Sequence, residues 1–407
     1  MTIAHRITTA SACRSLAPVL EPDTSLAPVL VAVAPISSRD VTSLGEAAVA
    51  AGLTLVVASS HDELSARLGV RPPRAVVFEA GHPDARKLCG AVRGNPMTSS
   101  VALFALSDAP ATVFASALAW GASEVVERAS LAELRRSLRM LHGVPLTIAK
   151  PKGRAVIAHR NDEARSVIAS ALASAGFAVE LVADGPALRR AIASSAPALI
   201  VCGAESSVDP FVDELAHVRA GGSLVPWILS LPRPAIRGAR ALLESLPYVA
   251  VHDASTPPDG VLFLANEISN GGYADARVTA RVLHAAPIRI RGGGLELASY
   301  TYNVSEGGLF ARTLMPLTIG LEVELELDAP LTAHTVRLDA KVTWQRPFGP
   351  LGGAVSPPGV GFALTGDTTP DRAVYAAACA SLASDVAPVA SGNGRTLKPW
   401  PVAAPTR

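Results

Sequence analysis

The sequence is poor in cysteine and in aromatic residues, and each shortage excludes a kind of structure. There are four cysteines, far apart and without a CxxC pair or a histidine at metal-ligating spacing: Cys13, Cys89, Cys202 and Cys379. We therefore expect neither a disulfide framework nor a zinc site. This use of cysteine is typical of a protein in a reducing compartment. Aromatic residues make up 4% of the chain. The cores are thus predicted to consist of small aliphatic side chains in closely packed helix-on-sheet layers.

The sequence also lacks an excess of charge and a long apolar run. Its 36 basic and 35 acidic residues give a formal net charge of +1. This balance gives no reason to expect DNA or RNA binding, so local arginines would have to hold any anionic ligand. No apolar run reaches the roughly 18 residues of a membrane span, and no continuous apolar stretch near the N-terminus resembles a secretory signal. We expect a cytoplasmic protein that does not insert into a membrane.

Two segments repeat the same alternation of strand-like and helical runs, residues 29–145 and residues 152–265. Each contains five strand-like runs, and these are continuously apolar, as in Ala198–Cys202. Continuous apolar strands are typical of a sheet that is covered on both faces. Strands that alternate with helices indicate parallel crossovers. The sequence therefore predicts two doubly wound, flavodoxin-like α/β domains.

The pattern changes to a period of two from about residue 286. Glu322–Leu327 alternates strictly, and Val336–Trp344 places every apolar residue on one face. One buried face and one solvated face indicate an antiparallel sheet or small barrel. A final helix is predicted from Asp371 to about Ser384. Residues 277–385 are thus expected to form a small antiparallel β-barrel with a C-terminal helix.

The remaining segments are rich in small residues and proline. Residues 1–28 and 386–407 have a composition typical of disordered tails. Residues 266–276 contain the run Ser269-Asn-Gly-Gly-Tyr273, which predicts a flexible linker between the second α/β domain and the barrel.

In element order and length, both α/β segments resemble the receiver domains of two-component response regulators. A working receiver holds magnesium with an acidic pair after its first strand and accepts a phosphoryl group on an aspartate ending the third strand. A hydroxyl and a lysine follow the fourth and fifth strands. In the first segment Glu79 stands at the aspartate position, with Ser107 and Arg128 at the hydroxyl and lysine positions. Pro35 stands where the acidic pair would be.

The second segment departs further from a working receiver. His159 follows its first strand, and Cys202-Gly203 occupies the aspartate position. Ser230 is matched to the hydroxyl and either His252 or Asp253 to the lysine. Because neither segment has the carboxylates that a magnesium site needs, aspartyl phosphorylation is not expected. The two domains are interpreted as interaction or scaffold domains.

The side chains at the aspartate positions of the two segments have more than one possible interpretation. Glu79 could mimic a phosphorylated aspartate, but a surface carboxylate at a strand end is the simpler interpretation. Cys202 is interpreted as a small buried side chain rather than a reactive thiol.

Two motifs flank the first long strand-like stretch of the barrel segment. Arg277-Val-Thr-Ala-Arg281 precedes the strand predicted from Pro287, and Asn303-Val-Ser305-Glu-Gly-Gly308 follows it. Either motif alone is common, but their order and the barrel pattern that follows are specific. On these motifs the segment resembles the PilZ family, whose members carry RxxxR and [D/N]xSxxG. The resemblance implies a β-barrel that binds cyclic di-GMP, with no other cofactor and no metal.

The resemblance assigns ligand binding to the following residues: Arg277, Arg281, Asn303, Ser305, Gly307 and Gly308. Their types suit the ligand. A guanidinium can donate two hydrogen bonds to guanine O6 and N7 or pair with a phosphate. Amide and hydroxyl groups can satisfy the polar edge of a guanine. Glycines allow the backbone to turn and the ligand to approach closely.

We interpret the chain as a non-enzymatic bacterial signalling adaptor that binds cyclic di-GMP and acts on an unidentified protein partner. Our hypothesis is that ligand orders the Arg277–Arg281 loop against the barrel and changes the interdomain arrangement. A scaffold or dimerisation protein with a non-binding barrel is the alternative, and a homo-oligomer fits either. A phosphorylation-driven response regulator is disfavoured by Pro35, His159 and Cys202.

Overall fold

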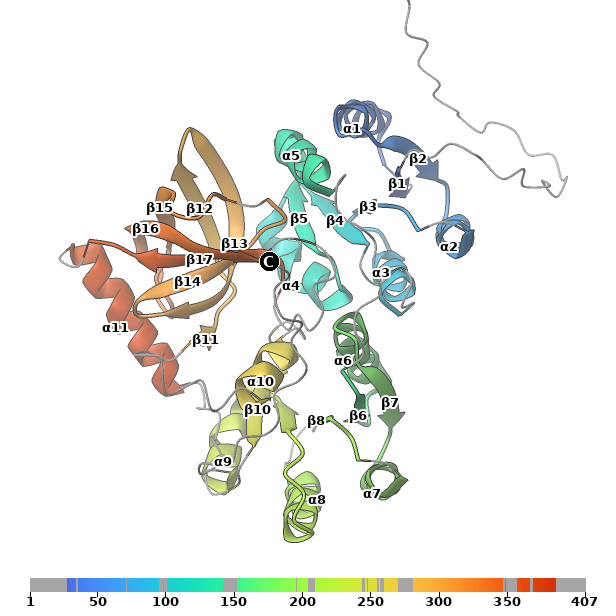
Figure 1. Ribbon diagram of the computed structural model, residues 1–407, viewed down its shortest axis with the longest axis vertical. Helices are drawn as coiled ribbons and strands as arrows, with labels where there is room; N and C mark the ends of the chain where they lie inside the picture. The colour runs from blue at the N-terminus through green and yellow to red at the C-terminus, as the bar shows by residue number, and fades with distance from the viewer. Residues whose placement is uncertain are drawn as a thin grey trace, which may run out of the picture.

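The structure is a computed structural model, and it describes residues 28–33, 36–70, 72–94, 98, 101–141, 152–194, 196–203, 209–243, 246, 248–254, 256, 260–269, 281–315, 317–346, 348, 357–366 and 369–385. These residues form two parallel-sheet α/β domains and an antiparallel barrel with a C-terminal helix (Figure 1). The predicted fold class is confirmed. The predictions for Cys13, Pro35, Arg277, residues 1–27, linker residues 270–276 and residues 386–407 lie outside the described residues.

The first α/β domain has a parallel sheet with the strand order β2-β1-β3-β4-β5. This order is that of the flavodoxin-like doubly wound fold, which receivers share. Its strands are β1 (Val29–Val33), β2 (Thr54–Ala58), β3 (Ala75–Glu79), β4 (Ala102–Ser107) and β5 (Glu124–Glu127). Its helices are α1 (Ser38–Ala50), α2 (His61–Val70), α3 (Ala85–Gly94), α4 (Pro110–Trp120) and α5 (Leu131–Leu141), the last preceded by the 3-10 turn η1 (Arg128–Ser130).

The second α/β domain repeats this order from the other edge, as β10-β9-β8-β6-β7. Its strands are β6 (Arg154–Ala158), β7 (Ala178–Val182), β8 (Leu199–Gly203), β9 (Trp227–Leu231) and β10 (Val249–Asp253). Its helices are α6 (Asp162–Ser174), α7 (Gly185–Ser194), α8 (Asp209–Ala220), α9 (Arg233–Leu243) and α10 (Gly260–Ser269). Helix α10 extends into residues 266–269, which we expected in the linker. The reason is that its apolar face continues to Ile268, which is 2% exposed.

The barrel is closed because its longest early strand, residues 295–305, pairs with strands at both ends of the sheet order. The strands are β11 (Val282–Leu283), β12 (Pro287–Gly292), β13 (Leu295–Ser305), β14 (Gly308–Arg312), β15 (Glu322–Asp328), β16 (Thr335–Arg346) and β17 (Gly359–Leu364). The order β11-β13-β12-β15-β16-β17-β14 returns to its start through the β13–β14 pairing. Helix α11 (Pro370–Asp385) packs against the barrel core through Tyr375, Ala378, Cys379 and Leu382.

The apolar side chains that alternate along the predicted strands line the barrel core. Along β16, for example, Val336, Leu338, Ala340 and Val342 are buried, and the residues between them are exposed. The two glycines Gly293 and Gly294 form a two-residue turn between β12 and β13, with φ of 60° and 75°. Such φ values are those of the tight hairpin turns that match the twist of a sheet.

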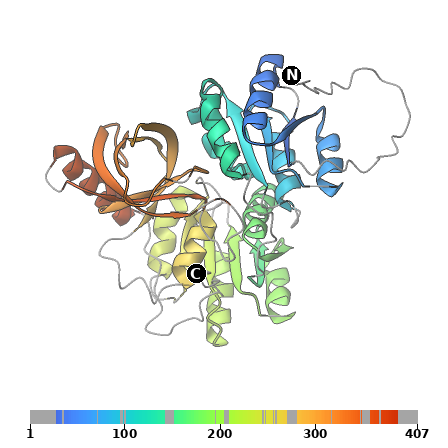
Figure 2. The same ribbon diagram turned by 45° about the horizontal axis from the view of Figure 1, so that its top comes forward.

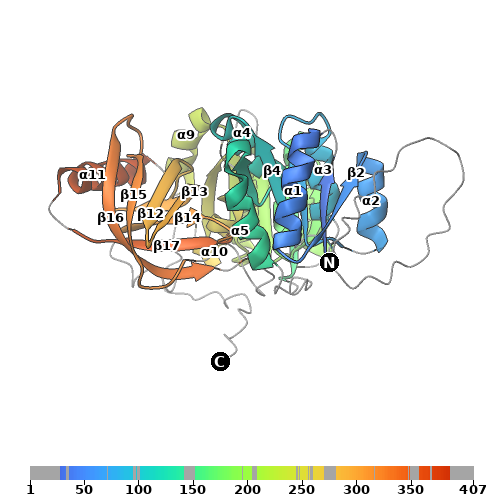
Figure 3. The ribbon, with the colours of Figure 1, turned by 90° about the horizontal axis from the view of Figure 1, so that it is seen from above.

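Strand β13 contacts both α/β domains. The ring of Tyr300 stacks on Phe114 of α4, and the ring of Tyr302 meets Phe263 of α10 edge-on, with 5.9 Å between ring centroids. Figures 2 and 3 show the barrel beside the first α/β domain, with α4 and α5 facing it and α11 on the far side of the barrel. Among the described residues, no helix has both the length and the apolar character needed to cross a bilayer.

Candidate functional site

A pocket of about 280 Å³ lies at the tip of the β13–β14 hairpin. It is lined by Arg281, Asn303, Ser305, Gly307, Gly308, Leu309, Phe310, Thr343, Trp344, Gly361, Phe362 and Ala363. Five of the six predicted ligand residues are therefore together in one pocket. The sixth, Arg277, lies outside the described residues, and the assignment of all six to ligand binding stays a prediction.

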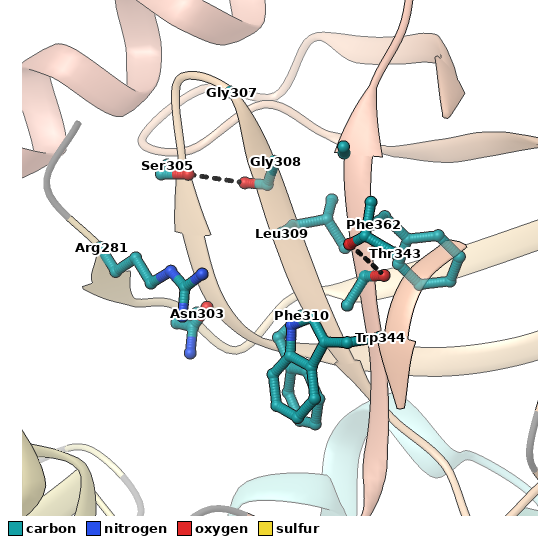
Figure 4. A pocket seen from close by; sticks show the side chains of 12 residues that line it. Arg281, Asn303, Ser305, Gly307, Gly308, Leu309, Phe310, Thr343, Trp344 and Phe362 are labelled. Carbon is teal, nitrogen blue, oxygen red and sulfur yellow. Dashed lines mark hydrogen bonds between the residues drawn. The ribbon is translucent and has the colours of Figure 1, made fainter. Parts of the chain in front are cut away.

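The pairing of β11 with β13 brings the two sequence motifs together. Val282 lies opposite Val304 in this antiparallel pair, so continuing the register by one residue sets Arg281 opposite Ser305. Arg281 is exposed, whereas Asn303 is 8% exposed. Figure 4 shows both side chains on the same side of the pocket. The pocket thus combines an exposed cation with a largely buried amide.

Hydrogen bonds hold the hairpin tip in shape. The Ser305 hydroxyl donates to the carbonyl of Gly308 over 3.1 Å (Figure 4). Two residues of α11 contact the same tip: Arg372 donates to the carbonyl of Glu306, and the Tyr375 hydroxyl donates to that of Gly308 over 3.4 Å. The C-terminal helix therefore braces the loop that carries the second motif.

The two motif glycines differ in what they do. A Cβ on Gly308 would lie 2.3 Å from the carbonyl oxygen of Phe362, so glycine is required there by the close approach of β17. A Cβ on Gly307 would meet nothing within 4 Å. Neither residue has a left-handed φ. The turn therefore uses backbone angles that are open to any residue, and close ligand approach at the two glycines stays a prediction.

A tryptophan that we expected on the buried face of β16 instead lines the pocket. Trp344 is 38% exposed, and its ring stacks on Phe310 with 5.0 Å between centroids and 20° between planes (Figure 4). The register of β16 against β17 shifts between Val342 and Trp344. A β-bulge of this kind turns later side chains to the other face. Strict alternation in the sequence gives no sign of it.

A glycine makes room for this ring. A Cβ on Gly361 would lie 2.2 Å from Nε1 of Trp344, and the neighbouring Thr343 hydroxyl donates to the carbonyl of Gly361 over 3.1 Å. The pocket therefore offers a flat, partly exposed aromatic surface beside the polar groups of Arg281 and Asn303. Charged, hydrogen-bonding and stacking groups on one pocket suit a purine nucleotide better than an apolar ligand.

The carboxyl end of the first parallel sheet is filled by an arginine. Arg128 donates hydrogen bonds to the carboxylates of Asp40 and Glu79, and through Nε to Asp108 over 2.9 Å. The hydrogen bond to Glu79, with the charges of Glu79 and Asp40, raises the pKa of Arg128. Glu79 is thus an ion-pair partner. Sequence reasoning missed Asp40, which sits in the first turn of α1 rather than directly after β1.

The carboxyl end of the second sheet is filled by an imidazole ring. Gly203 ends β8, and a Cβ there would lie 1.8 Å from Cδ2 of His159. The His159 ring therefore occupies the space next to the position of a phospho-accepting side chain, and its Nδ1 accepts the N–H of Asn161 over 3.0 Å. Cys202 is fully buried, and burial raises the pKa of its thiol. A buried protonated thiol is unreactive, as predicted.

The register of the two sheets corrects one sequence match. Glu79 and Gly203 each end a five-residue third strand, and they lie opposite Leu106 and Ser230. Ser230 therefore corresponds to Leu106, one residue before the position of Ser107. Because side chains alternate along a strand, its hydroxyl is on the other face of the sheet. The match of Ser230 to the receiver hydroxyl is wrong.

His252 lies opposite Ser230 and on the same face, under α10. Thr256 donates its hydroxyl proton to the carbonyl of Asp253 over 2.6 Å. Nε2 of His252 lies 3.2 Å from the Thr256 hydroxyl, and Nδ1 lies 3.0 Å from the Ser230 hydroxyl. These contacts make His252 a buried, hydrogen-bonded residue of the domain core. Across the described part of the chain, no three His, Cys, Asp or Glu side chains are grouped so as to hold a metal ion.

The part of the chain that forms the pocket matches a known protein family. Residues 275–380 match the family model of the PilZ domain. These residues form a PilZ domain. The two α/β domains that precede it are receiver-like in strand order, and both lack the aspartate that a receiver phosphorylates.

Solved structures with similar folds include PilZ and receiver proteins. The Bacillus subtilis inhibitor of motility MotI/DgrA is 17% identical with a TM-score of 0.22, and the match covers 26% of this chain and 49% of that one, about half its length. The PilZ domain of Escherichia coli YcgR, solved with c-di-GMP, is 16% identical over 27% of this chain and 92% of that one, with a TM-score of 0.22.

A third similar structure is the Escherichia coli RcsC C-terminus, which contains a phosphoreceiver domain. It is 10% identical over 61% of this chain and 96% of that one, with a TM-score of 0.25. No curated protein matches the chain.

Proposed function

We propose that this protein is a signalling adaptor that binds cyclic di-GMP in the PilZ pocket at the tip of the β13–β14 hairpin. One observation carries the proposal. Residues of both sequence motifs, Arg281 from one and Asn303 and Ser305 from the other, line a single pocket next to the exposed ring of Trp344.

Each of these groups has a counterpart on the ligand. The Arg281 guanidinium can donate to guanine O6 and N7 or pair with a phosphate. The Asn303 amide and the Ser305 hydroxyl can pair with the polar edge of the base. A guanine can also stack on the Trp344 ring, a contact worth about 1–3 kcal/mol per base in single-stranded nucleic-acid complexes.

The volume indicates how much of the ligand the pocket takes. At about 280 Å³ it is at the lower end of the ~300–1,000 Å³ of small-molecule sites. We infer that it accepts one half of the cyclic dinucleotide. The other half then extends out of the pocket, past the exposed Arg281.

We further propose that the α/β domains bind a protein partner and do no chemistry, in a cytoplasmic, non-enzymatic protein. Support comes from the filled carboxyl ends of both sheets, where Arg128 and His159 stand at or beside the positions of receiver chemistry. A scaffold with a non-binding barrel is the alternative that the following experiment separates.

The test is titration calorimetry of the full chain with cyclic di-GMP at tens of micromolar protein. Binding is expected for the wild-type chain, and Arg281→Ala is expected to weaken it by about 10- to 150-fold, the equivalent of losing a charge-assisted hydrogen bond of about 1.5–3 kcal/mol. If the wild-type chain gives no heat of binding, the alternative of a scaffold protein with a non-binding barrel is favoured.

Arg289→Ala is the matched control. Arg289 is an exposed arginine on β12 that faces Glu296 and Glu326 and does not line the pocket. Its replacement is expected to leave the affinity unchanged. Equal binding by the wild-type chain and Arg281→Ala would show that the site is wrongly assigned, even if the chain binds.

A further inference from the structure

A row of aromatic rings runs from the pocket to the second α/β domain. Its members, hereafter the aromatic row, are Trp344, Phe310, Tyr302 and Phe263. Trp344 stacks on Phe310 with 5.0 Å between centroids. Phe310 meets Tyr302 edge-on at 6.0 Å, and Tyr302 meets Phe263 edge-on at 5.9 Å. Each ring therefore touches the next, and the last lies on α10.

The middle of this row belongs to the core of the second domain. Tyr302 and Phe310 are each 2% exposed, and both lie in the apolar cluster that contains Phe263 and its α10 neighbours. Leu283 of β11, two residues after Arg281, packs against the same cluster. A Cβ on Gly260, the first residue of α10, would lie 3.0 Å from Cδ1 of Leu283. Leu283, two residues after Arg281, and Tyr302, next to Asn303, thus both pack against α10.

We propose that occupancy of the PilZ pocket is coupled to the docking of α10, and with it the second α/β domain, through the aromatic row. The inference rests on the proposed function and names the contact through which binding acts. A ligand that stacks on Trp344 fixes the position of that ring. Because packed interiors leave no spare volume, fixing one ring restricts Phe310 and Tyr302 as well. Binding then favours the arrangement in which Phe263 is docked.

The contact with the first α/β domain provides a built-in comparison. Phe114 of α4 stacks on Tyr300, which is on the same strand as Tyr302. Tyr300 does not line the pocket and is not a member of the aromatic row. Both contacts join a phenylalanine of an α/β domain to a tyrosine of β13. The coupling is therefore expected for the second domain and not for the first.

The first experiment measures the affinity of the full chain for cyclic di-GMP in two variants. Phe263→Leu is expected to change the dissociation constant by about 5-fold or more, the lower end of typical coupling between sites. Phe114→Leu is expected to leave it unchanged. If Phe263→Leu fails to fold, Phe263→Met replaces it, because an unbranched side chain fills the gap without a ring. Wild-type affinity in the Phe263 variant, or an equal change in both, would overturn the coupling.

The second experiment uses the reciprocity of coupled sites. Hydrogen exchange of the amides in residues 260–269 is expected to slow when cyclic di-GMP saturates the wild-type chain, while exchange in residues 110–120 of α4 stays the same. Unchanged exchange in α10 at saturation overturns the coupling and leaves the proposed function standing. Absence of binding by the wild-type chain is a separate result, which overturns both proposals.

Discussion

The barrel pocket and the carboxyl ends of the two parallel sheets differ in what fills them. Carboxyl ends of parallel strands are where doubly wound folds bind their ligands. Here the first is filled by Arg128 among three carboxylates, and the second by the ring of His159 over Gly203. The barrel pocket, in contrast, keeps about 280 Å³ of space beside the exposed Arg281.

The two filled ends also differ from each other. In the first domain the guanidinium takes the place of the metal and the lysine of a receiver, so positive charge remains among the carboxylates. In the second domain an aromatic ring packs where a side chain would extend from β8. The same strand order therefore occurs with two different side chains at the carboxyl end of the sheet, which indicates that packing of the sheet core maintains the fold.

The largest loss of stability is expected when a side chain is introduced at Gly203, at the carboxyl end of the second sheet. Gly203→Asp restores the residue type of a receiver, but its Cβ would lie 1.8 Å from His159. Overpacking of this kind costs about 1–3 kcal/mol, and a carboxylate without a metal adds to it. We expect chemical denaturation to show a destabilised variant, and mass spectrometry after treatment with acetyl phosphate to show no phosphoryl group. A stable, phosphorylated variant would contradict the conclusion that His159 fills the carboxyl end of the second sheet.

A smaller loss of stability is expected at the first sheet end. Arg128→Met removes the cation that pairs with Asp40, whose side chain is 6% exposed. A buried charged group left without its partner costs about 1–3 kcal/mol or more, and the free energy of unfolding measures it.

Arg86→Met is the matched control for this prediction. Arg86 pairs with Glu163, which is 68% exposed, so its loss is expected to cost less than about 1 kcal/mol. Equal losses in the two variants would mean that the Arg128 cluster is no more than a surface ion pair.

Much of the fold could be predicted from the sequence because it depends on local pattern. The apolar run predicted at Ala198–Cys202 forms β8 with a difference of one residue at each end, and the alternating run Glu322–Leu327 forms β15. The alternation along β16 also predicts its buried face as far as Val342. Apolar continuity and a period of two are properties of neighbouring residues, so they are visible without any knowledge of tertiary contacts.

The parts of the site that escaped prediction depend on register. The exposure of Trp344 follows from a one-residue bulge, and the misplacement of Ser230 follows from a one-residue offset between sheets. Asp40 reaches Arg128 only because α1 returns to the sheet end. None of these leaves a mark on the local sequence. Arg281 and Asn303, in contrast, could be paired in advance because each belongs to a recognisable motif.

The most direct test of the central claim, that the barrel pocket reads guanine, compares two cyclic dinucleotides on the wild-type chain. Calorimetric titrations with cyclic di-GMP and with cyclic di-AMP present the same phosphate ring and differ in the base edge. Adenine presents an amino donor where guanine presents the O6 acceptor, and a good bidentate contact discriminates by about 1–3 kcal/mol, or roughly 5- to 150-fold. The account predicts binding of cyclic di-GMP with at least this preference. Equal affinity for the two ligands, or no binding of either, would contradict it.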